Sequence, residues 1–272
     1  MIDPQNLAPS PAPETTLVTE SSSAGSLAPI PTPSPRPDIP GWQATILLAL
    51  ILAVGGYFRF LGLNWDSDQH LHPDERFMTN VASAIRPVSI FQYFDTEKST
   101  LNPFPYGSFT YGMFPLFLTR YVAELVNKTD YKDIVLVGRV LSALFDLAAV
   151  ALLFFLGARL YNRRIGLLAA ALSAAAVLPI QLSHYFAVDS FATVFIVAAF
   201  YVAVPTMDGG KRWHYAIFGL LTGLAMACKI NTAPLAGVIL VTGIVRLVKA
   251  WRTAANRREL LKEVLTGWLI AG

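Results

Sequence analysis

Acidic and histidine side chains are concentrated in the segment NWDSDQHLHPDERF, which spans residues 64–77. Asp74 and Glu75 stand side by side near its end, directly after His72 and Pro73. A carboxylate beside a membrane surface loses part of its hydration, which raises its proton affinity and suits it to general-base work. Asp74 is therefore the candidate base, and Glu75 a neighbour for orientation or a second contact. Capping of a helix N-terminus accounts for both acids equally well.

The same segment alternates side chains that can bind a metal ion. An extended chain would place alternate residues on one face, and carboxylates and imidazoles in such an array can hold a divalent cation. A solvated polar loop is the competing interpretation. The candidate metal ligands are His72 and Asp74, preceded by Asp66, Asp68 and His70.

The composition places this segment in a membrane protein. Of the 272 residues, 54% are hydrophobic and 14% charged, and the mean hydropathy is +0.49. A soluble domain of this length needs more polar surface. The net charge of +3 is small and the basic residues cluster between apolar runs, which favours a membrane topology over nucleic-acid binding. With a single cysteine, Cys228, the chain has no intramolecular disulfide framework.

Apolar segments of about the 20 residues that cross a bilayer follow one another along the chain. They predict an all-α, polytopic transmembrane helix bundle over residues 41–272. Residues 1–40, rich in Pro, Ser, Thr and Ala, predict a disordered tail. The segment that begins at Val264 reaches the end of the sequence, so we expect further chain beyond Gly272. The predicted spans are 44–63, 134–157, 165–182, 186–205, the short 215–228, and 232–248.

The short loops between these segments fall into two sets by charge. In one set, formed by SHYFAVDS and KINTAP, Lys229 is the only Lys or Arg. The positive-inside rule places the other, basic set in the cytoplasm, together with the N-terminal tail of a multi-pass plasma membrane protein. The loop of residues 64–133 then shares the extracytoplasmic face with His184, Asp189 and Lys229. The basic set contains Arg159, Arg163, Arg164, Lys211, Arg212, Arg246, Lys249, Arg252, Arg257 and Arg258.

The 64–133 loop predicts two amphipathic helices in the membrane interface. Phe77, Val81, Ala84 and Ile85 recur at helical spacing after Pro73. A second aromatic stretch, SFTYGMFPLFLTRYVAEL, follows the turn LNPFPYG. Two such helices beside the outer mouth of a bundle would form a cleft between lipid and water.

Charged residues also occur within or beside the predicted spans. Arg59 is expected to extend its charge to the lipid headgroups. Arg139 and Asp146 lie two turns apart in one span, where they would brace one another or serve a site. For a phosphate-linked substrate at the outer face, the available cations are Lys229, Arg139 and Arg76. Lys229 could equally extend to the headgroups.

In their order along the chain, six motifs resemble the GT-C superfamily of polytopic glycosyltransferases, in particular its protein O-mannosyltransferase and aminoarabinose-transferase branch. The resemblance covers about residues 42–250. In that family a sugar is taken from a polyprenyl-phosphate donor, and an aspartate of the first outer loop is the catalytic base, which corresponds to Asp74 here. The motifs are FRFLGL, HPDERF, GSFTYGMFPLFL, GRVLSALFDLAAVALLFFLGARLY, PIQLSHYFAVDSFATVFIVAAFY and GLLTGLAMACKINTAP.

The resemblance implies a hexosyl- or pentosyl-transferring enzyme, with a polyprenyl-phosphate-linked sugar and membrane lipid as partners and a glycan, lipid or protein as acceptor. Two other functions remain open. A transporter or flippase of lipid-linked sugar would place polar groups near the bilayer midplane and between repeats, whereas here they gather on one face. A noncatalytic assembly subunit would use the acidic loop for docking. Beside the phosphate-neutralising cations, the expected substrate-binding residues are Tyr111, His184 and Asp189.

Overall fold

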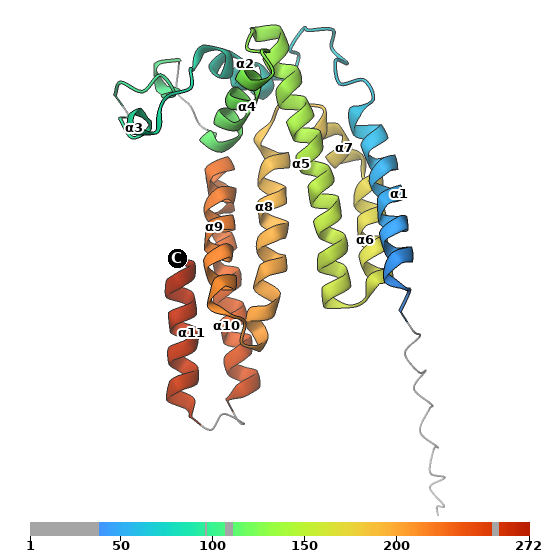
Figure 1. Cartoon of the computed structure of the whole chain (residues 1–272), viewed down its shortest axis with the longest axis vertical. Helices are drawn as coiled ribbons and strands as arrows, with labels where there is room; N and C mark the ends of the chain where they lie inside the picture. Colours follow the sequence, from blue (N-terminus) through green and yellow to red (C-terminus); the bar gives the residue numbers. More distant parts are fainter. Residues whose placement is uncertain (1–37, 96, 107–110, 252–255) are drawn as a thin grey trace, which may run out of the picture. The chain divides into compact units, whose positions relative to one another are not determined.

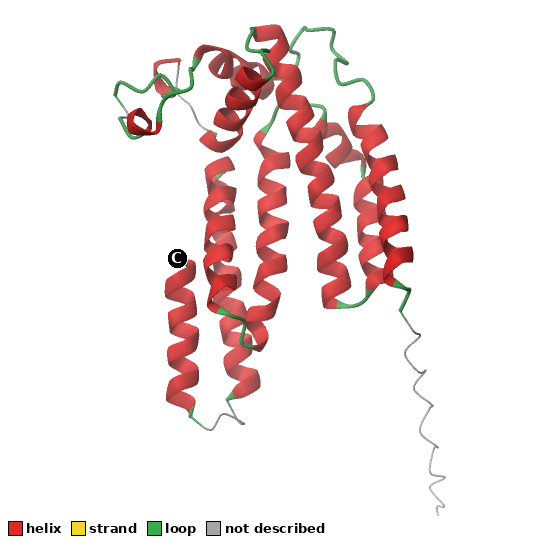
Figure 2. Cartoon of the chain, viewed as in Figure 1, coloured by secondary structure: helices red, strands yellow, loops and turns green. Residues whose placement is uncertain are grey.

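The computed structural model describes residues 38–95, 97–106, 111–251 and 256–272. These residues form helices joined by loops, without strands, in a compact unit Asp38–Gly272 (Figure 2). The predicted all-α class is confirmed. Most of the predicted N-terminal tail lies outside the described residues.

Four helical segments in the described part of the chain are long and apolar enough to cross a membrane. They are α1 (Gly41–Phe60), α5 (Tyr131–Leu160), α8 (Val188–Ala203) with its 3₁₀ extension η2 (Val204–Asp208), and α10 (Ala236–Ala250) with the preceding η3 (Ile230–Leu235). The helix α9 (Arg212–Cys228), with 17 residues, is at the short end of what spans a bilayer core. The last helix, α11, covers Arg257–Ala271.

A bent pair of helices makes up the predicted span 165–182. The two helices, α6 (Arg163–Ala175) and α7 (Val177–Ser183), meet at an angle of 59°. Pro179 explains the bend, because proline has no N–H to donate to the carbonyl four residues earlier and its ring clashes with that carbonyl. The carbonyls left over at the end of α6 then need other donors.

Arg59 of α1 supplies those donors. Its guanidinium is fully buried and donates to the carbonyl oxygens of Ala174 (3.0 Å) and Ser173 (3.3 Å). It also forms an ion pair with Asp146 of α5, with 2.5 Å between Nε and Oδ2. The expectation that Arg59 extends to the headgroups was therefore wrong, and so was the pairing of Arg139 with Asp146.

The residues between α1 and α5 form a helical layer over one end of the bundle (Figure 1). It consists of α2 (Pro73–Ala84), α3 (Ile90–Tyr93), η1 (Phe104–Tyr106) and α4 (Met113–Leu125).

The apolar face of α2 packs against protein. Val81 and Ile85 are almost completely buried in a cluster with Leu116 of α4 and Ile134 of α5. Arg120 of α4 donates to the carbonyls of Ala82 and Ser83 at the end of α2, where cations are favoured. The two predicted helices are therefore present, and they are packed on one another and on α5.

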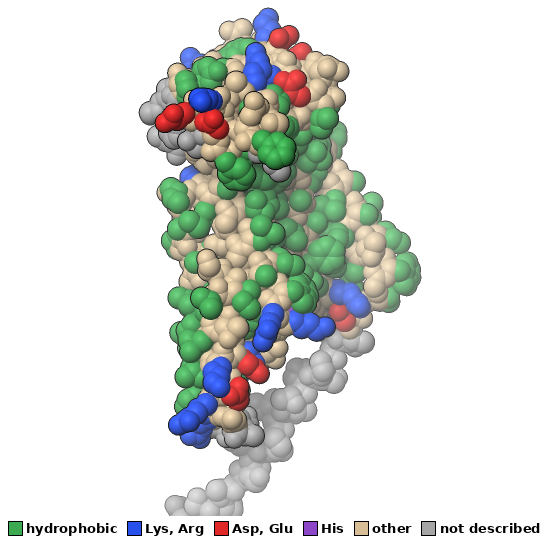
Figure 3. Space-filling view, turned by 60° about the vertical axis from the view of Figure 1, so that its left-hand side comes forward, with side chains coloured by type: hydrophobic (Ala, Val, Ile, Leu, Met, Phe, Trp, Pro, Cys, Tyr) green, Lys and Arg blue, Asp and Glu red, His purple; other side chains and the backbone are tan. Residues whose placement is uncertain are grey.

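Charged side chains gather at the two ends of the unit. On the face drawn in Figure 3 they lie over the α2–α4 layer and over the opposite end, and hydrophobic side chains occupy the region between. Such a band is the surface that a hydrocarbon core requires.

Candidate active site

The first turn of α2 orients the two candidate acids. His72 precedes the helix, and its Nδ1 accepts a hydrogen bond from the backbone N–H of Glu75 (3.3 Å), as an N-cap residue does. Pro73 is the first helical residue, a position that proline favours. Asp74 is exposed, whereas Glu75 is completely buried. The acids therefore have different surroundings although they are neighbours in the sequence.

Glu75 is held by a buried guanidinium. Arg139 of α5 donates from Nε to Glu75 Oε1 (2.8 Å) and from Nη2 to Oε2 (2.6 Å). The backbone N–H of Phe186, in the turn before α8, also donates to Oε1 (2.7 Å). One carboxylate thus joins α2, α5 and the α7–α8 turn.

Asp66 completes the set of Arg139 partners. Its two oxygens accept from Nη1 (3.1 Å) and Nη2 (2.9 Å), and the carbonyl of Leu63 accepts from Nη1 (2.7 Å). Burial alone would raise the pKa of Asp66, but hydrogen bonds and the charge of Arg139 outweigh it, so the pKa lies below its usual value. We call Asp66, Glu75 and Arg139 the carboxylate clamp.

The carboxylate clamp uses every donor of its arginine. A guanidinium has five N–H groups, and all five point at the carbonyl of Leu63 or at the carboxylates of Asp66 and Glu75. Arg139 therefore has no donor left for a substrate phosphate, contrary to expectation. Glu75 is a positioning residue for α2, because its oxygens face protein donors.

Asp74 instead contacts Tyr111, which lies just before α4. Burial raises the pKa of Tyr111 to about 12, together with a side-chain hydrogen bond to Asp74 and the negative charges of Asp74 and Asp189. The Tyr111 hydroxyl therefore stays protonated over the physiological range and can donate to the Asp74 carboxylate. These three residues share one neighbourhood.

Lys229 joins the same neighbourhood from the end of α9. Its Nζ lies 2.8 Å from Oδ1 of Asp189, in the first turn of α8, and both side chains are about two-fifths exposed. An ammonium group has three N–H donors, so this contact leaves others directed elsewhere. Lys229 is a partly exposed cation in the same neighbourhood as Tyr111 and Asp189.

Gly112 brings the α4 segment against the end of α9. Its N–H donates to the carbonyl of Cys228 (3.0 Å). A Cβ at this position would lie 2.1 Å from the carbonyl oxygen of Ala227, so only glycine allows this approach. Gly112 was not identified in the sequence analysis. Its position between Tyr111 and the start of an apolar helix is the feature that could have indicated a close backbone contact.

Two other predicted residues have structural partners. The ring nitrogens of His184 lie 2.8 Å from the carbonyl oxygen of Ile180 and 2.9 Å from that of Leu61, so the ring joins α7 to the end of α1. Arg76 is exposed, and its charge acts on Tyr131 at the start of α5.

The candidate metal ligands do not converge. Among the described residues, no group of three or more His, Cys, Asp or Glu is arranged to hold a metal ion. The 67–70 segment turns, with positive φ at Ser67, Asp68 and His70, so the alternating face of an extended chain is not formed. His72 caps α2 and stacks on Tyr185, with 4.3 Å between ring centroids.

Comparison with known proteins identifies the family and the fold of the chain. Residues 113–271 match the family model of dolichyl-phosphate-mannose-protein mannosyltransferase. The apo crystal structure of an Archaeoglobus fulgidus oligosaccharyltransferase is similar in fold, with a TM-score of 0.58 and 14% sequence identity over 85% of this chain. The chain spans about a third of that protein, 33% of its length. No curated protein sequence matches. The chain belongs to the dolichyl-phosphate-mannose-protein mannosyltransferase family, within the GT-C membrane glycosyltransferases.

Proposed function

We infer that this chain carries the catalytic end of a glycosyltransferase that moves a sugar from a polyprenyl-phosphate donor to an acceptor hydroxyl on the extracytoplasmic side. The observation that carries the proposal is the grouping of an exposed acid, Asp74, with Tyr111 and the Lys229–Asp189 pair. These residues come from separate segments of the chain, and they combine a proton acceptor with a cation.

Asp74 acts as the general base. Its carboxylate is exposed to an incoming acceptor, while the neighbouring Glu75 fixes the helix that bears it. As the acceptor oxygen attacks the anomeric carbon, its O–H bond breaks and the proton passes to Asp74. The bond from the anomeric carbon to the phosphate oxygen breaks, and its electron pair leaves with the phosphate. Hydrogen bonding from Tyr111 holds the carboxylate in place.

Lys229 stabilises the departing phosphate. Its ammonium group is partly exposed and is held beside Asp189 at the same end of the bundle as Asp74. A positioned cation that meets charge developing in the transition state can lower a barrier by several kcal/mol. The isoprenoid chain of the donor would lie along the apolar surface of the spans.

Replacement of Asp74 by Asn tests the proposal. In the full-length protein, Asp74→Asn should lower the rate of lipid-phosphate release from a polyprenyl-phosphate sugar by about 100- to 10,000-fold, the usual contribution of a general base. Thermal stability should change little, because Asp74 is exposed and the side-chain oxygen of Asn can still accept a hydrogen bond from Tyr111. The matched control is Asp95→Asn in the same loop, also exposed, which should keep its rate. Full turnover in Asp74→Asn would remove this residue from the mechanism.

A further inference from the structure

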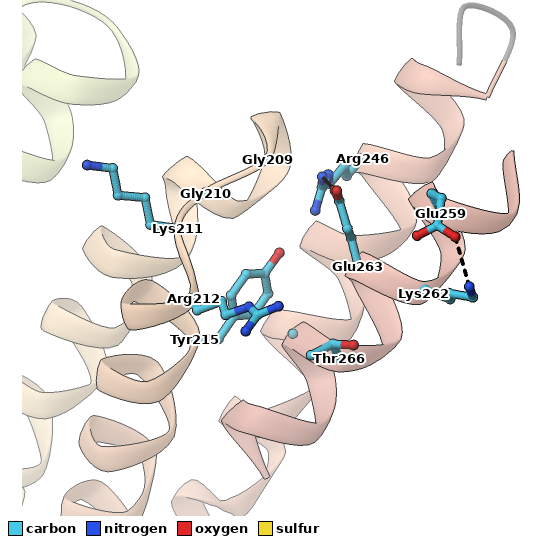
Figure 4. A pocket seen from close by; sticks show the side chains of 11 residues that line it. Gly209, Gly210, Lys211, Arg212, Tyr215, Arg246, Glu259, Lys262, Glu263 and Thr266 are labelled. Atoms are coloured by element: carbon cyan, nitrogen blue, oxygen red, sulfur yellow. Dashed lines mark hydrogen bonds and ion pairs between the residues drawn. The ribbon is translucent and has the colours of Figure 1, made fainter. Parts of the chain in front are cut away.

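A polar pocket lies at the end of the unit opposite α2–α4. It has a volume of about 360 Å³ and lies between the η2–α9 turn, the first turn of α9, and the helices α10 and α11 (Figure 4). The 17 residues of α9 separate it from Cys228 and the candidate active site, a distance of about 25 Å at the usual helical rise. Its volume is within the range of small-ligand sites.

Positive charge predominates around this pocket. It is lined by four basic side chains and two acidic ones. Arg246 is paired with Glu263, and Lys262 with Glu259 at 2.8 Å. Lys211 and Arg212 supply the two positive charges in excess.

The N-terminus of α9 adds partial positive charge to the pocket. Lys211 precedes α9 as its N-cap residue without a side-chain capping bond, and the first turn contains no acid. The N-terminal N–H groups and the helix dipole there favour an anion. A helix start that lacks both a cap and an acid leaves these donors for a ligand.

A buried hydroxyl is a second, separate observation that indicates an anionic ligand in this pocket. Tyr215, one turn into α9, is only 2% exposed, and its hydroxyl has no hydrogen-bond partner. Figure 4 shows this hydroxyl directed toward the space between Gly209 and Glu263. A buried hydroxyl without an acceptor destabilises a fold, so a ligand oxygen that accepts its proton would be favoured.

We propose that this pocket binds a phosphate group, with Arg212, the start of α9 and the Tyr215 hydroxyl as its donors. Lys211 adds positive charge nearby, but its side chain extends away from the pocket (Figure 4). The phosphate could belong to an anionic phospholipid headgroup or be free in solution. A lipid fits the surroundings, since Trp213 and Leu265, next in sequence to the lining residues Arg212 and Thr266, are about half exposed and can contact acyl chains. Basic pockets between helices at the cytoplasmic leaflet are typical headgroup sites.

The test compares two phosphate sources with the purified full chain. In detergent, the shift in unfolding temperature is measured against inorganic phosphate. In nanodiscs, it is measured with phosphatidylglycerol in phosphatidylcholine against phosphatidylcholine alone. We expect stabilisation that falls at high salt. A shift with inorganic phosphate alone identifies a free-phosphate site, and one with phosphatidylglycerol alone identifies a headgroup site.

Variants locate the site. The variant Arg212→Gln should weaken phosphate affinity by about tenfold or more, the scale of losing a charge-assisted hydrogen bond. Tyr215→Phe should weaken affinity without lowering the unfolding temperature of the ligand-free protein. The matched control is Arg258→Gln, a basic residue at the start of α11 that does not line the pocket. No stabilisation by either source, or an equal loss in the control, would overturn the proposal.

Discussion

Asp74 and Glu75 follow one another in α2, and the helix turns by about 100° between them. That rotation sends one carboxylate into the protein, where Arg139 and the Phe186 amide bind it, and leaves the other exposed beside Tyr111. A buried carboxylate without partners would be protonated or would destabilise the fold. Full pairing of Glu75 therefore fixes the helix turn from which, in the proposed mechanism, Asp74 meets an acceptor.

Tyr111→Phe tests the contact between Tyr111 and Asp74. We expect transfer to fall by about tenfold, because a hydrogen bond to a charged group is lost. The pKa of Tyr111 is raised from 10.0 to about 12, so the folded protein keeps a proton that the unfolded chain loses. Its contribution to the free energy of unfolding is complete below pH 10 and is lost as the pH rises toward 12.

The measurement is thermal unfolding of the parent and the variant across pH 8–12. The unfolding temperature of Tyr111→Phe should fall less above pH 10 than that of the parent. Below pH 10 the two plots of unfolding temperature against pH should run parallel. Identical curves throughout would show that burial and the contact with Asp74 do not raise the pKa of Tyr111 in the folded protein.

At the scale of elements, the carboxylate clamp holds the α2–α4 layer on the bundle. Its members come from the residues after α1, from α2 and from α5, and the Phe186 amide adds the turn before α8. Trp65 covers the guanidinium, with 5.8 Å from Arg139 Cζ to the ring centroid. The buried Arg139 is therefore one of the contacts that keep the candidate active-site residues of the layer in place relative to Lys229.

Glu75→Gln should loosen that layer. Breaking a buried ion pair by removing one partner costs about 3–5 kcal/mol, because the other charge stays buried. We expect faster proteolysis of residues 61–130 and a lower unfolding temperature. The matched control is Glu124→Gln, which breaks the partly exposed pair with Arg120 and should cost about 1 kcal/mol or less. Equal effects of the two changes would contradict a special role for the clamp.

Local sequence patterns, such as hydrophobic spacing and proline positions, predicted the helices well. They did not predict contacts between segments that are distant in the sequence. The spacing of Val81 and Ile85 placed α2, and Pro73 placed its start. The partners of Arg59 and Arg139 depend on which helices pack side by side. The spacing of hydrophobic residues within one segment carries no information about that packing. The approach of Gly112 to α9 is likewise a long-range contact. Asp74, Tyr111, Asp189 and Lys229 could be assigned to one face from loop charge alone, while the separate position of Glu75 could not.

At the scale of the whole molecule, charge and apolar surface suggest how the bundle lies in a bilayer. The predicted cytoplasmic loops contain Arg163, whose backbone N–H and side chain bind Asp38 and Ile39 before α1. They also contain Arg246 and Lys249, paired with Glu263 and Asp208. The candidate active site belongs to the other set of loops. The proposed transfer requires that set to face the extracytoplasmic side.

Cysteine labelling tests this orientation. Cys228 is buried and can be changed to Ala, after which single cysteines are placed at Glu97 in the α2–α4 layer or at Arg258 in the first turn of α11. A membrane-impermeant maleimide added to intact cells should label the first position and not the second. Labelling of Arg258→Cys alone would reverse the orientation and remove the extracytoplasmic site.

Chain order gives the carboxylate clamp a consequence for biogenesis. Asp66 and Glu75 leave the ribosome before Arg139, and the Phe186 amide and Lys229 follow later still. The two acids therefore stay hydrated and unpaired until α5, which carries Arg139, has been inserted. The candidate active site is complete only after α9 has been synthesised. If the translocon releases the early helices together, Asp66 and Glu75 do not enter the membrane region without Arg139.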